Sequence, residues 1–271
     1  MAEVKFKGAA LHYELEGSPA GPPLVLIHAG VATLRMWDAV VPALGADHRI
    51  LRYDTRGFGL TSTEDVSFSD VDDLLAVMDA AGIERATLIG ASRGGRIAID
   101  AAVEHPDRVA GLVTVGSNPS GFPDVELTER ENDLFDVLDD LLAAGDLERL
   151  NRLEAELWAA GPTRDVLELD PAFLETAYAL NAANVRHAGD APRAVPIEPP
   201  AFERTVDIEV PSLFIVGEHD LSTELAATEY LLSTVPDSSG ATFPDTAHLP
   251  SVERPAEFVR VLGGWLGAHG L

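Results

Sequence analysis

The stretch Leu88-Ile-Gly-Ala-Ser-Arg-Gly-Gly-Arg96 decides the fold, because it places a serine between two glycines in the pattern GxSxG. An apolar run before it, residues 86–89, predicts a strand, and residues 95–103 after it predict a helix. A serine on such a sharp turn has a strained backbone, and the residues two before and two after it crowd together, so Gly90 and Gly94 must lack side chains. The pattern therefore predicts that the Ser92 hydroxyl is a nucleophile standing at the carboxyl end of a strand, over a helix N-terminus.

Strand-like and helix-like stretches alternate outward from this turn. Alternation of this kind implies crossover connections and a mostly parallel central sheet flanked by helices, so the predicted fold class is α/β. Residues 4–15 alternate apolar and polar side chains around Gly8, which predicts an antiparallel hairpin. The expected strands are 24–27, 49–53, 86–89, 109–115, 212–216 and 241–243, and the expected helices are 36–44, 71–81, 95–103 and 255–266.

The alternation stops at about Asn118. Apolar residues between 134 and 158 recur every three or four positions, which predicts amphipathic helices with acidic outer faces, and a further helix is expected at 173–185. We find no strand-like run here, and a proline-rich linker follows at 192–200. We therefore predict a core of residues 1–117 and 206–271, with residues 118–205 as a helical cap. An inserted helical layer of this kind is a natural lid, and a subdomain without function is the alternative.

A serine nucleophile needs a base, and His248 is the candidate among eight histidines. It follows the last strand signal and a turn, and it precedes the C-terminal helix, so it lies at the carboxyl end of a strand. The orienting acid should stand at the end of another strand, where Val216-Gly-Glu-His-Asp220 offers Asp220. Glu218 is the competing acid and His219 the competing base. Along the chain the three residues then follow the order serine, aspartate, histidine, which is the order expected for a fold whose serine nucleophile lies on a strand-to-helix turn.

Acyl transfer also needs donors for a developing oxyanion. The residue after the nucleophile, Arg93, should supply one backbone N–H. The second should come from the loop after strand 24–27, His28-Ala-Gly30, where the small Gly30 lets the backbone approach a substrate. We assign His28 a supporting role in that loop, rather than a role as base.

Taken together, these motifs resemble those of the α/β-hydrolase fold superfamily. His28-Ala-Gly30 resembles its oxyanion loop, Asp54-Thr-Arg-Gly-Phe-Gly59 its Asp-x-Arg-Gly-x-Gly turn, and Ala247-His-Leu-Pro-Ser-Val-Glu-Arg-Pro255 its histidine loop. Ala29 departs from the glycine that is common there. The resemblance is closest to esterases and enol-lactonases and covers about 20–117 and 205–270. A serine at the elbow argues against the haloalkane dehalogenases and epoxide hydrolases of this fold, which use aspartate.

Composition narrows the function further. The 271 residues carry a net charge of −26, which disfavours nucleic acid and membrane surfaces as partners and leaves a small-molecule substrate. The absence of cysteine excludes disulfides and thiolate chemistry. We find no metal-ligand motif, secretory signal or membrane-spanning run, so we expect no metal or other cofactor and a cytoplasmic location. The oligomeric state is left open, with a homodimer as one alternative.

The remaining polar and aromatic candidates have two interpretations each. Asp54 and Arg56 are expected to pair with each other or with backbone and fix a turn. The Arg93 side chain either holds an anionic substrate or pairs with an acidic residue of the cap. Trp37, Phe135, Trp158 and Leu249 are candidates for the substrate pocket. Phe173 is a further candidate, and a core role is the favoured alternative for Trp37, Phe135, Trp158 and Phe173.

Three functions remain in competition. The first is a serine hydrolase that cleaves a small carboxylic ester or lactone through an acyl-enzyme. The second is a C–C bond hydrolase or a cofactor-free perhydrolase on the same triad. The third is a ligand-binding protein that keeps the fold without turnover.

Overall fold

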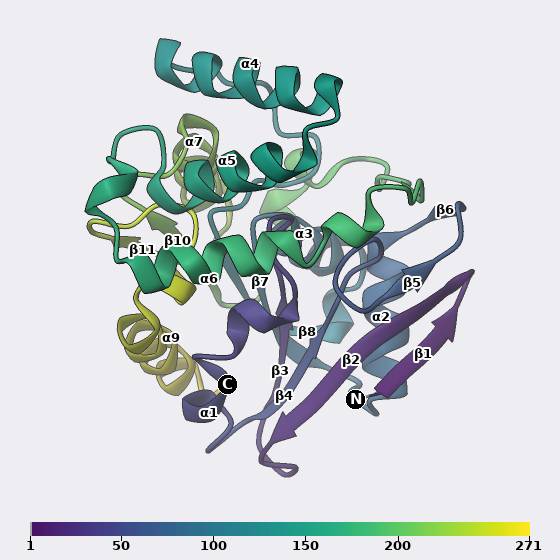
Figure 1. The fold of residues 1–271 in the computed structure, drawn as a ribbon. Helices are drawn as coiled ribbons and strands as arrows, with labels where there is room; N and C mark the ends of the chain where they lie inside the picture. Colours follow the sequence, from purple (N-terminus) through teal and green to yellow (C-terminus); the bar gives the residue numbers. More distant parts are fainter. Residues whose placement is uncertain (1) are drawn as a thin grey trace.

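The computed structural model describes residues 2–271, and a nine-stranded sheet forms the centre of this part of the chain (Figure 1). The strand order is β1-β2-β4-β3-β7-β8-β10-β11, with β5 paired to β2. The pairs β1–β2 and β2–β4 are antiparallel, and the six strands from β4 to β11 are parallel. The predicted N-terminal hairpin and mostly parallel sheet are therefore confirmed. The strands are β1 (Ala2–Phe6), β2 (Ala9–Gly17), β3 (Pro23–Ile27), β4 (Arg49–Tyr53), β5 (Ser62–Thr63), β6 (Ser67–Phe68), β7 (Ala86–Ala91), β8 (Val109–Val115), β9 (Arg193–Ala194), β10 (Ser212–Gly217) and β11 (Ser238–Phe243).

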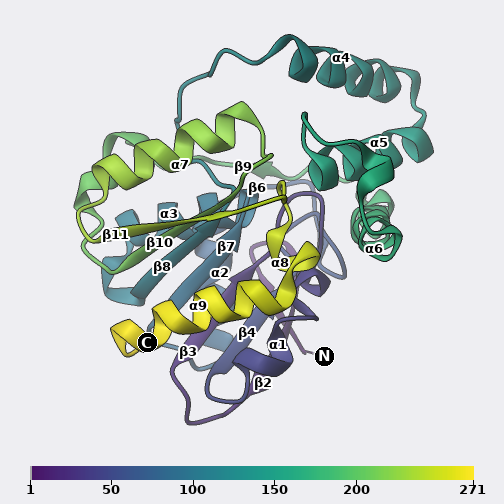
Figure 2. The ribbon, with the colours of Figure 1, turned by 90° about the vertical axis from the view of Figure 1, so that its left-hand side faces the viewer.

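Helices cover both faces of this sheet. Figure 2 shows α9 on one face and α3 and α7 on the other. The helices are α1 (Val41–Leu44), α2 (Asp70–Ala80), α3 (Arg93–Glu104), α4 (Glu129–Ala144), α5 (Leu147–Ala160), α6 (Pro171–Ala182), α7 (Ser222–Thr234), α8 (Pro250–Glu253) and α9 (Pro255–His269). Short 3-10 turns lie at Leu34–Trp37, Pro106–Arg108, Val166–Glu168, Val185–His187, Ala201–Glu203 and Thr205–Asp207.

Two hydrophobic cores hold the layers together. Along β3, Leu24 and Leu26 face the core under α1 and α9, while Val25 and Ile27 face the core under α2, α3 and α7. All four side chains are fully buried. Because both faces of such a strand are covered, its sequence is a continuous apolar run rather than an alternating one.

Residues 118–205, the cap segment, contain α4, α5 and α6. These helices stand outside the sheet layers, with α4 farthest from the sheet (Figures 1 and 2). Glu131 of α4 is fully buried and accepts hydrogen bonds from the backbone N–H groups of Thr128 and Ser222, at 2.8 and 2.6 Å. One carboxylate therefore caps α4 and α7 together and fixes the outermost cap helix to the core.

Two expectations about local structure were wrong. The helix expected at 36–44 is a 3-10 turn followed by the separate α1, because Pro42 has no N–H to donate to a carbonyl of the preceding turn. The cap segment also contains a strand, β9, which pairs in parallel with β6 of the core. A two-residue strand gives no periodic signal in sequence. Among residues 2–271, none of the helices has the length and apolar character needed to cross a bilayer.

Candidate active site

Ser92 lies on the turn between β7 and α3. Its backbone has φ +50° and ψ −118°, which a non-glycine residue adopts only when the surroundings hold it there. The Ser92 N–H donates to the Val115 carbonyl at 2.8 Å, which fixes the turn to the end of β8. A Cβ atom at Gly90 would overlap the Gly94 carbonyl, and one at Gly94 would overlap the Ile27 carbonyl. Close backbone contacts therefore require glycine at both positions, as the GxSxG pattern predicted.

His248 and Asp220 form a buried pair. The His248 Nδ1 atom lies 2.9 and 3.0 Å from the two carboxylate oxygens of Asp220, and the two residues are 2% and 3% exposed. Donation from Nδ1 to the carboxylate leaves Nε2 as the proton acceptor. The loops that carry them pack closely, since a Cβ at Gly217 would overlap the Ala247 carbonyl.

Gly116 connects this pair to the nucleophile. Its φ is +51°, and a Cβ there would lie 2.6 Å from Asp220 Oδ2 and 2.9 Å from His248 Nδ1. The preceding residue, Val115, accepts the Ser92 N–H, so Ser92 and the His248–Asp220 pair flank the same two residues at the end of β8. Gly116 was not among the predicted site residues, although a glycine directly after strand 109–115 is a visible signal.

The cap segment contacts the candidate base directly. The Trp158 carbonyl of α5 accepts the His248 backbone N–H at 3.2 Å, and the two rings lie 4.3 Å apart, centroid to centroid. The Trp158 indole therefore covers one side of the imidazole and limits its rotation.

A second carboxyl group stands near the pair. Glu224, in the first turn of α7, is 8% exposed, and its Oε2 atom has no hydrogen-bond partner. Burial raises the pKa of Glu224 to about 7, against the attraction of His248 and with a further rise from Asp220. Burial alone would lower the pKa of His248, but Asp220 and then Glu224 favour the imidazolium, and the net shift is upward from 6.5. No sequence pattern singles out this glutamate, since its burial depends on where α7 packs.

The candidate oxyanion donors lie next to each other. A Cβ at Gly30 would be 3.9 Å from the Arg93 Cβ, so the two backbones are neighbours. Within residues 2–271, neither the Gly30 nor the Arg93 backbone N–H donates to a protein group. His28 supports this loop, because its Nε2 accepts the Thr55 N–H at 3.0 Å and its Nδ1 lies 2.7 Å from the Ala29 carbonyl. Burial lowers its pKa to about 4, so His28 is neutral at pH 7.

The arginine and aspartate candidates have some of the expected partners and some others. Arg93 pairs with Asp70 of α2, at 2.6 Å, rather than with a residue of the cap segment. Asp54 does fix a turn, by accepting the Leu34 and Leu60 N–H groups at 2.8 Å each. Arg56 donates to the backbone carbonyl of Lys7 at 2.9 Å, which is one of the expected alternatives, and its ion-pair partner is Asp73 of α2, at 2.8 Å, rather than Asp54.

Four of the aromatic and apolar pocket candidates lie in different parts of the molecule. Trp37 is fully buried against Phe258, and Leu249, which is 2% exposed, belongs to the same core. Phe135 packs on the small cluster around Leu138. Of the four, Trp158 alone lies against the His248–Asp220 pair.

The competing residues of the acid loop lie on its outer side. Glu218 accepts the Asp245 N–H at 3.2 Å, and His219 Nδ1 lies 2.7 Å from Thr163 Oγ1. The ligand atoms of Glu218, His219 and Asp245 come within 4.8 Å of one another, a grouping that the sequence analysis did not anticipate. The hydrogen bonds of Glu218 and His219 explain why these three side chains lie close together, so we interpret the grouping as part of the loop structure.

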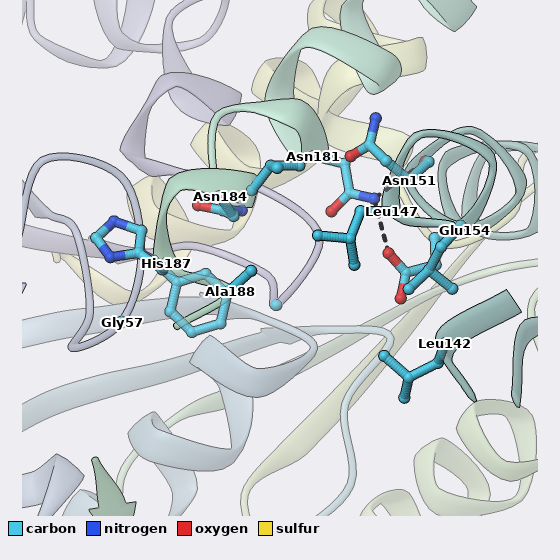
Figure 3. A pocket seen from close by; sticks show the side chains of 13 residues that line it. Gly57, Leu142, Leu147, Asn151, Glu154, Asn181, Asn184, His187 and Ala188 are labelled. Carbon is cyan, nitrogen blue, oxygen red and sulfur yellow. Dashed lines mark hydrogen bonds between the residues drawn. The ribbon is translucent and has the colours of Figure 1, made fainter. Parts of the chain in front are cut away.

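A chamber of about 330 Å³, open to solvent, lies between the cap segment and the core (Figure 3). On the core side it reaches Gly30 of the oxyanion loop and Phe58, whose ring lies 5.2 Å from that of His28. Ser92 and His248 do not line it, so it adjoins the oxyanion loop rather than the nucleophile. The chamber, named so from here on, is lined by Gly30, Gly57, Phe58, Leu142, Leu147, Leu150, Asn151, Glu154, Asn181, Asn184, Val185, His187 and Ala188.

Comparison with known proteins assigns this chain to a family. The sequence profile of the alpha/beta hydrolase fold family matches residues 22–255, and the chain belongs to that family. It is 30% identical to the 2-hydroxymuconate semialdehyde hydrolase of Pseudomonas sp. (strain CF600), over 95% of this chain and 91% of that one. It is 23% identical to 3-oxoadipate enol-lactonase 1 of Acinetobacter baylyi, over 96% and 94%. The crystal structure of a hydrolase from Pseudomonas aeruginosa PA01 superposes with a TM-score of 0.78, at 26% identity and 98% coverage of both chains.

Proposed function

We propose that this chain is a serine hydrolase that cleaves a small carboxylic ester or lactone through an acyl-enzyme. One observation carries the proposal. The His248 imidazole, hydrogen-bonded to Asp220 at 2.9 Å, packs on Gly116, and the residue before Gly116 accepts the backbone N–H of Ser92. The relatives that act on an enol-lactone and on a semialdehyde support a hydrolytic reaction at this site.

The roles follow from this arrangement. His248 Nε2 takes the proton from the Ser92 hydroxyl while the oxygen attacks the substrate carbonyl, and Asp220 keeps the imidazole in the required tautomer. The backbone N–H groups of Gly30 and Arg93 stabilise the oxyanion. The alcohol leaves with the proton from His248, and the acyl group stays on Ser92. A water molecule then attacks the acyl-enzyme, with His248 again as base, and the acid is released.

Replacement of the nucleophile tests the proposal. Ser92→Ala should reduce kcat/KM for p-nitrophenyl acetate by at least ~10³-fold, because the remaining groups have no oxygen to acylate. Ser233→Ala, on the exposed surface of α7, is the control and should keep wild-type turnover. A fluorophosphonate should add its mass to the peptide that contains Ser92. Undiminished turnover in Ser92→Ala would remove this residue from the mechanism.

The similarity to a 2-hydroxymuconate semialdehyde hydrolase favours a second candidate, C–C bond hydrolysis by the same three residues. Product analysis separates the two reactions. A vinylogous diketone should be cleaved to an acid and an enol if the second candidate holds. If esters are the substrates, the diketone should remain intact while p-nitrophenyl acetate is consumed.

A further inference from the structure

The chamber has an acidic wall. Glu154 of α5 is the one carboxylate among its described lining residues, and its Oε2 atom accepts the Asn181 side-chain N–H at 3.0 Å (Figure 3). The same Asn181 nitrogen donates to the Asn151 carbonyl at 3.2 Å. These bonds hold the carboxylate of Glu154 in place, on the cap side of the chamber.

No cation in the chamber is free to neutralise this charge. Lysine and arginine are absent from the described lining residues, and His187 is the single basic group. Both ring nitrogens of His187 are engaged, Nδ1 with Asp190 at 2.7 Å and Nε2 with the Gly59 carbonyl at 2.9 Å. Arg93, whose Cβ lies beside Gly30 of the oxyanion loop, is paired with Asp70. A substrate carboxylate would therefore meet Glu154 without a counter-charge.

The chamber also offers unused acceptors beside an apolar surface. Within residues 2–271, neither Glu154 Oε1 nor Asn181 Oδ1 accepts a hydrogen bond from the protein. Leucine side chains from the end of α4 and the start of α5, among them Leu142 and Leu147, supply the apolar part of the lining. Such a surface suits an alkyl chain that ends in a hydrogen-bond donor.

We propose that the chamber selects esters or lactones whose distal part is neutral or cationic and carries a hydroxyl or ammonium group, and that it disfavours a second carboxylate. This inference rests on the proposed function. If a substrate carboxylate is taken to lie about 6 Å from Glu154, with an effective dielectric constant between about 20 and 80, their repulsion corresponds to between roughly threefold and a hundredfold in affinity. We expect about tenfold.

Four methyl esters of similar length test the inference: methyl heptanoate, methyl 6-hydroxyhexanoate, methyl 6-aminohexanoate and monomethyl adipate. The hydroxyl and ammonium esters should have the highest kcat/KM, and monomethyl adipate should fall about tenfold below methyl heptanoate. Glu154→Gln should reduce this heptanoate-to-adipate ratio about tenfold. Glu148→Gln makes the same charge change on the exposed side of α5, outside the chamber, and should leave the ratio as in wild type.

An unchanged ratio in Glu154→Gln, or equal turnover of the adipate and hydroxyl esters by wild type, overturns the inference while the ester hydrolase stands. If wild type cleaves p-nitrophenyl acetate but none of the methyl esters, the four are compared as competitive inhibitors of that reaction, and equal inhibition overturns the inference. If Ser92→Ala turns over p-nitrophenyl acetate as well as wild type, the proposed function fails, and the inference fails with it.

Discussion

Gly116→Ala introduces one methyl group at the point where the candidate acid and base meet. The added Cβ would lie 2.6 Å from Asp220 Oδ2 and 2.9 Å from His248 Nδ1, whereas ordinary contacts begin at 3.4 Å. Restoring that distance requires shifts of 0.8 Å (3.4 − 2.6) and 0.5 Å (3.4 − 2.9). The two side chains must therefore move, and the hydrogen bond between them must lengthen or break.

The expected loss of activity follows from these shifts. Misplacement of a catalytic group by about 1 Å costs on the order of 10²-fold in rate. We therefore expect kcat/KM for p-nitrophenyl acetate to fall about 10²-fold or more, which is about 2.7 kcal/mol of transition-state stabilisation. The positive φ at this position adds about 1–2 kcal/mol of strain to the folded state of the alanine variant.

Gly82→Ala separates strain from collision. Gly82 has a φ of +65°, close to that of Gly116, but a Cβ there meets no atom within 4 Å. This control should lose similar stability from strain, as measured by urea unfolding, and should keep kcat/KM within about twofold of wild type at temperatures where both variants are folded. If Gly116→Ala were as active as Gly82→Ala, the contact between β8 and the His248–Asp220 pair would have no part in catalysis.

Three other substitutions test the electrostatics around the site. Glu224→Gln removes a negative charge near His248, and this charge, with that of Asp220, raises the pKa of the His248 imidazole despite its burial. The acid limb of the pH profile of kcat/KM should therefore move to lower pH in the variant. An unmoved acid limb would show that Glu224 does not influence the pKa of His248. Burial also raises the pKa of Glu224 from 4.5 to about 7, so the folded state holds a proton that the unfolded state releases at lower pH. Wild type should therefore lose up to about 3 kcal/mol of stability as pH rises from about 4.5 to 7. Urea unfolding of Glu224→Gln should show a smaller loss over the same range. Burial opposes the charge of Glu131, but the hydrogen bonds to its carboxylate outweigh burial and lower its pKa. Glu131→Gln should therefore destabilise the fold by about 1–3 kcal/mol above pH 4.5. The destabilisation should become smaller as pH falls through the folded-state pKa of Glu131. Arg93→Ala should change kcat/KM for monomethyl adipate and methyl heptanoate by the same factor, because the Arg93 guanidinium already pairs with the Asp70 carboxylate of α2. A loss confined to monomethyl adipate would show that the Arg93 side chain binds anionic substrates.

The sequence predicted the parts of the site that depend on local geometry. The turn at Ser92 needs glycines at fixed offsets, and those offsets are visible in one stretch of nine residues. Asp220 and His248 could be proposed together because each follows a recognisable strand, and the carboxyl ends of parallel strands meet at one edge of the sheet.

The features that sequence reasoning missed depend on packing between distant segments. Gly116 is constrained by two loops that lie more than a hundred residues further along the chain. The burial of Glu224 and the pairing of Arg93 with Asp70 depend on how α7 and α2 pack, which periodicity does not reveal. The break at Pro42 was visible as a proline, and the helical pattern around it concealed the break.

The bond between the Trp158 carbonyl and the main chain of His248 matters for protein engineering. A chimaera that replaces residues 118–205 with the corresponding segment of a homologue would also replace the Trp158 carbonyl. The donor fragment would then have to supply an acceptor for the amide of residue 248, in addition to a cavity of the desired shape. Residues 118–205 are therefore not an interchangeable module, and grafting designs should keep residues 157–161 from this chain.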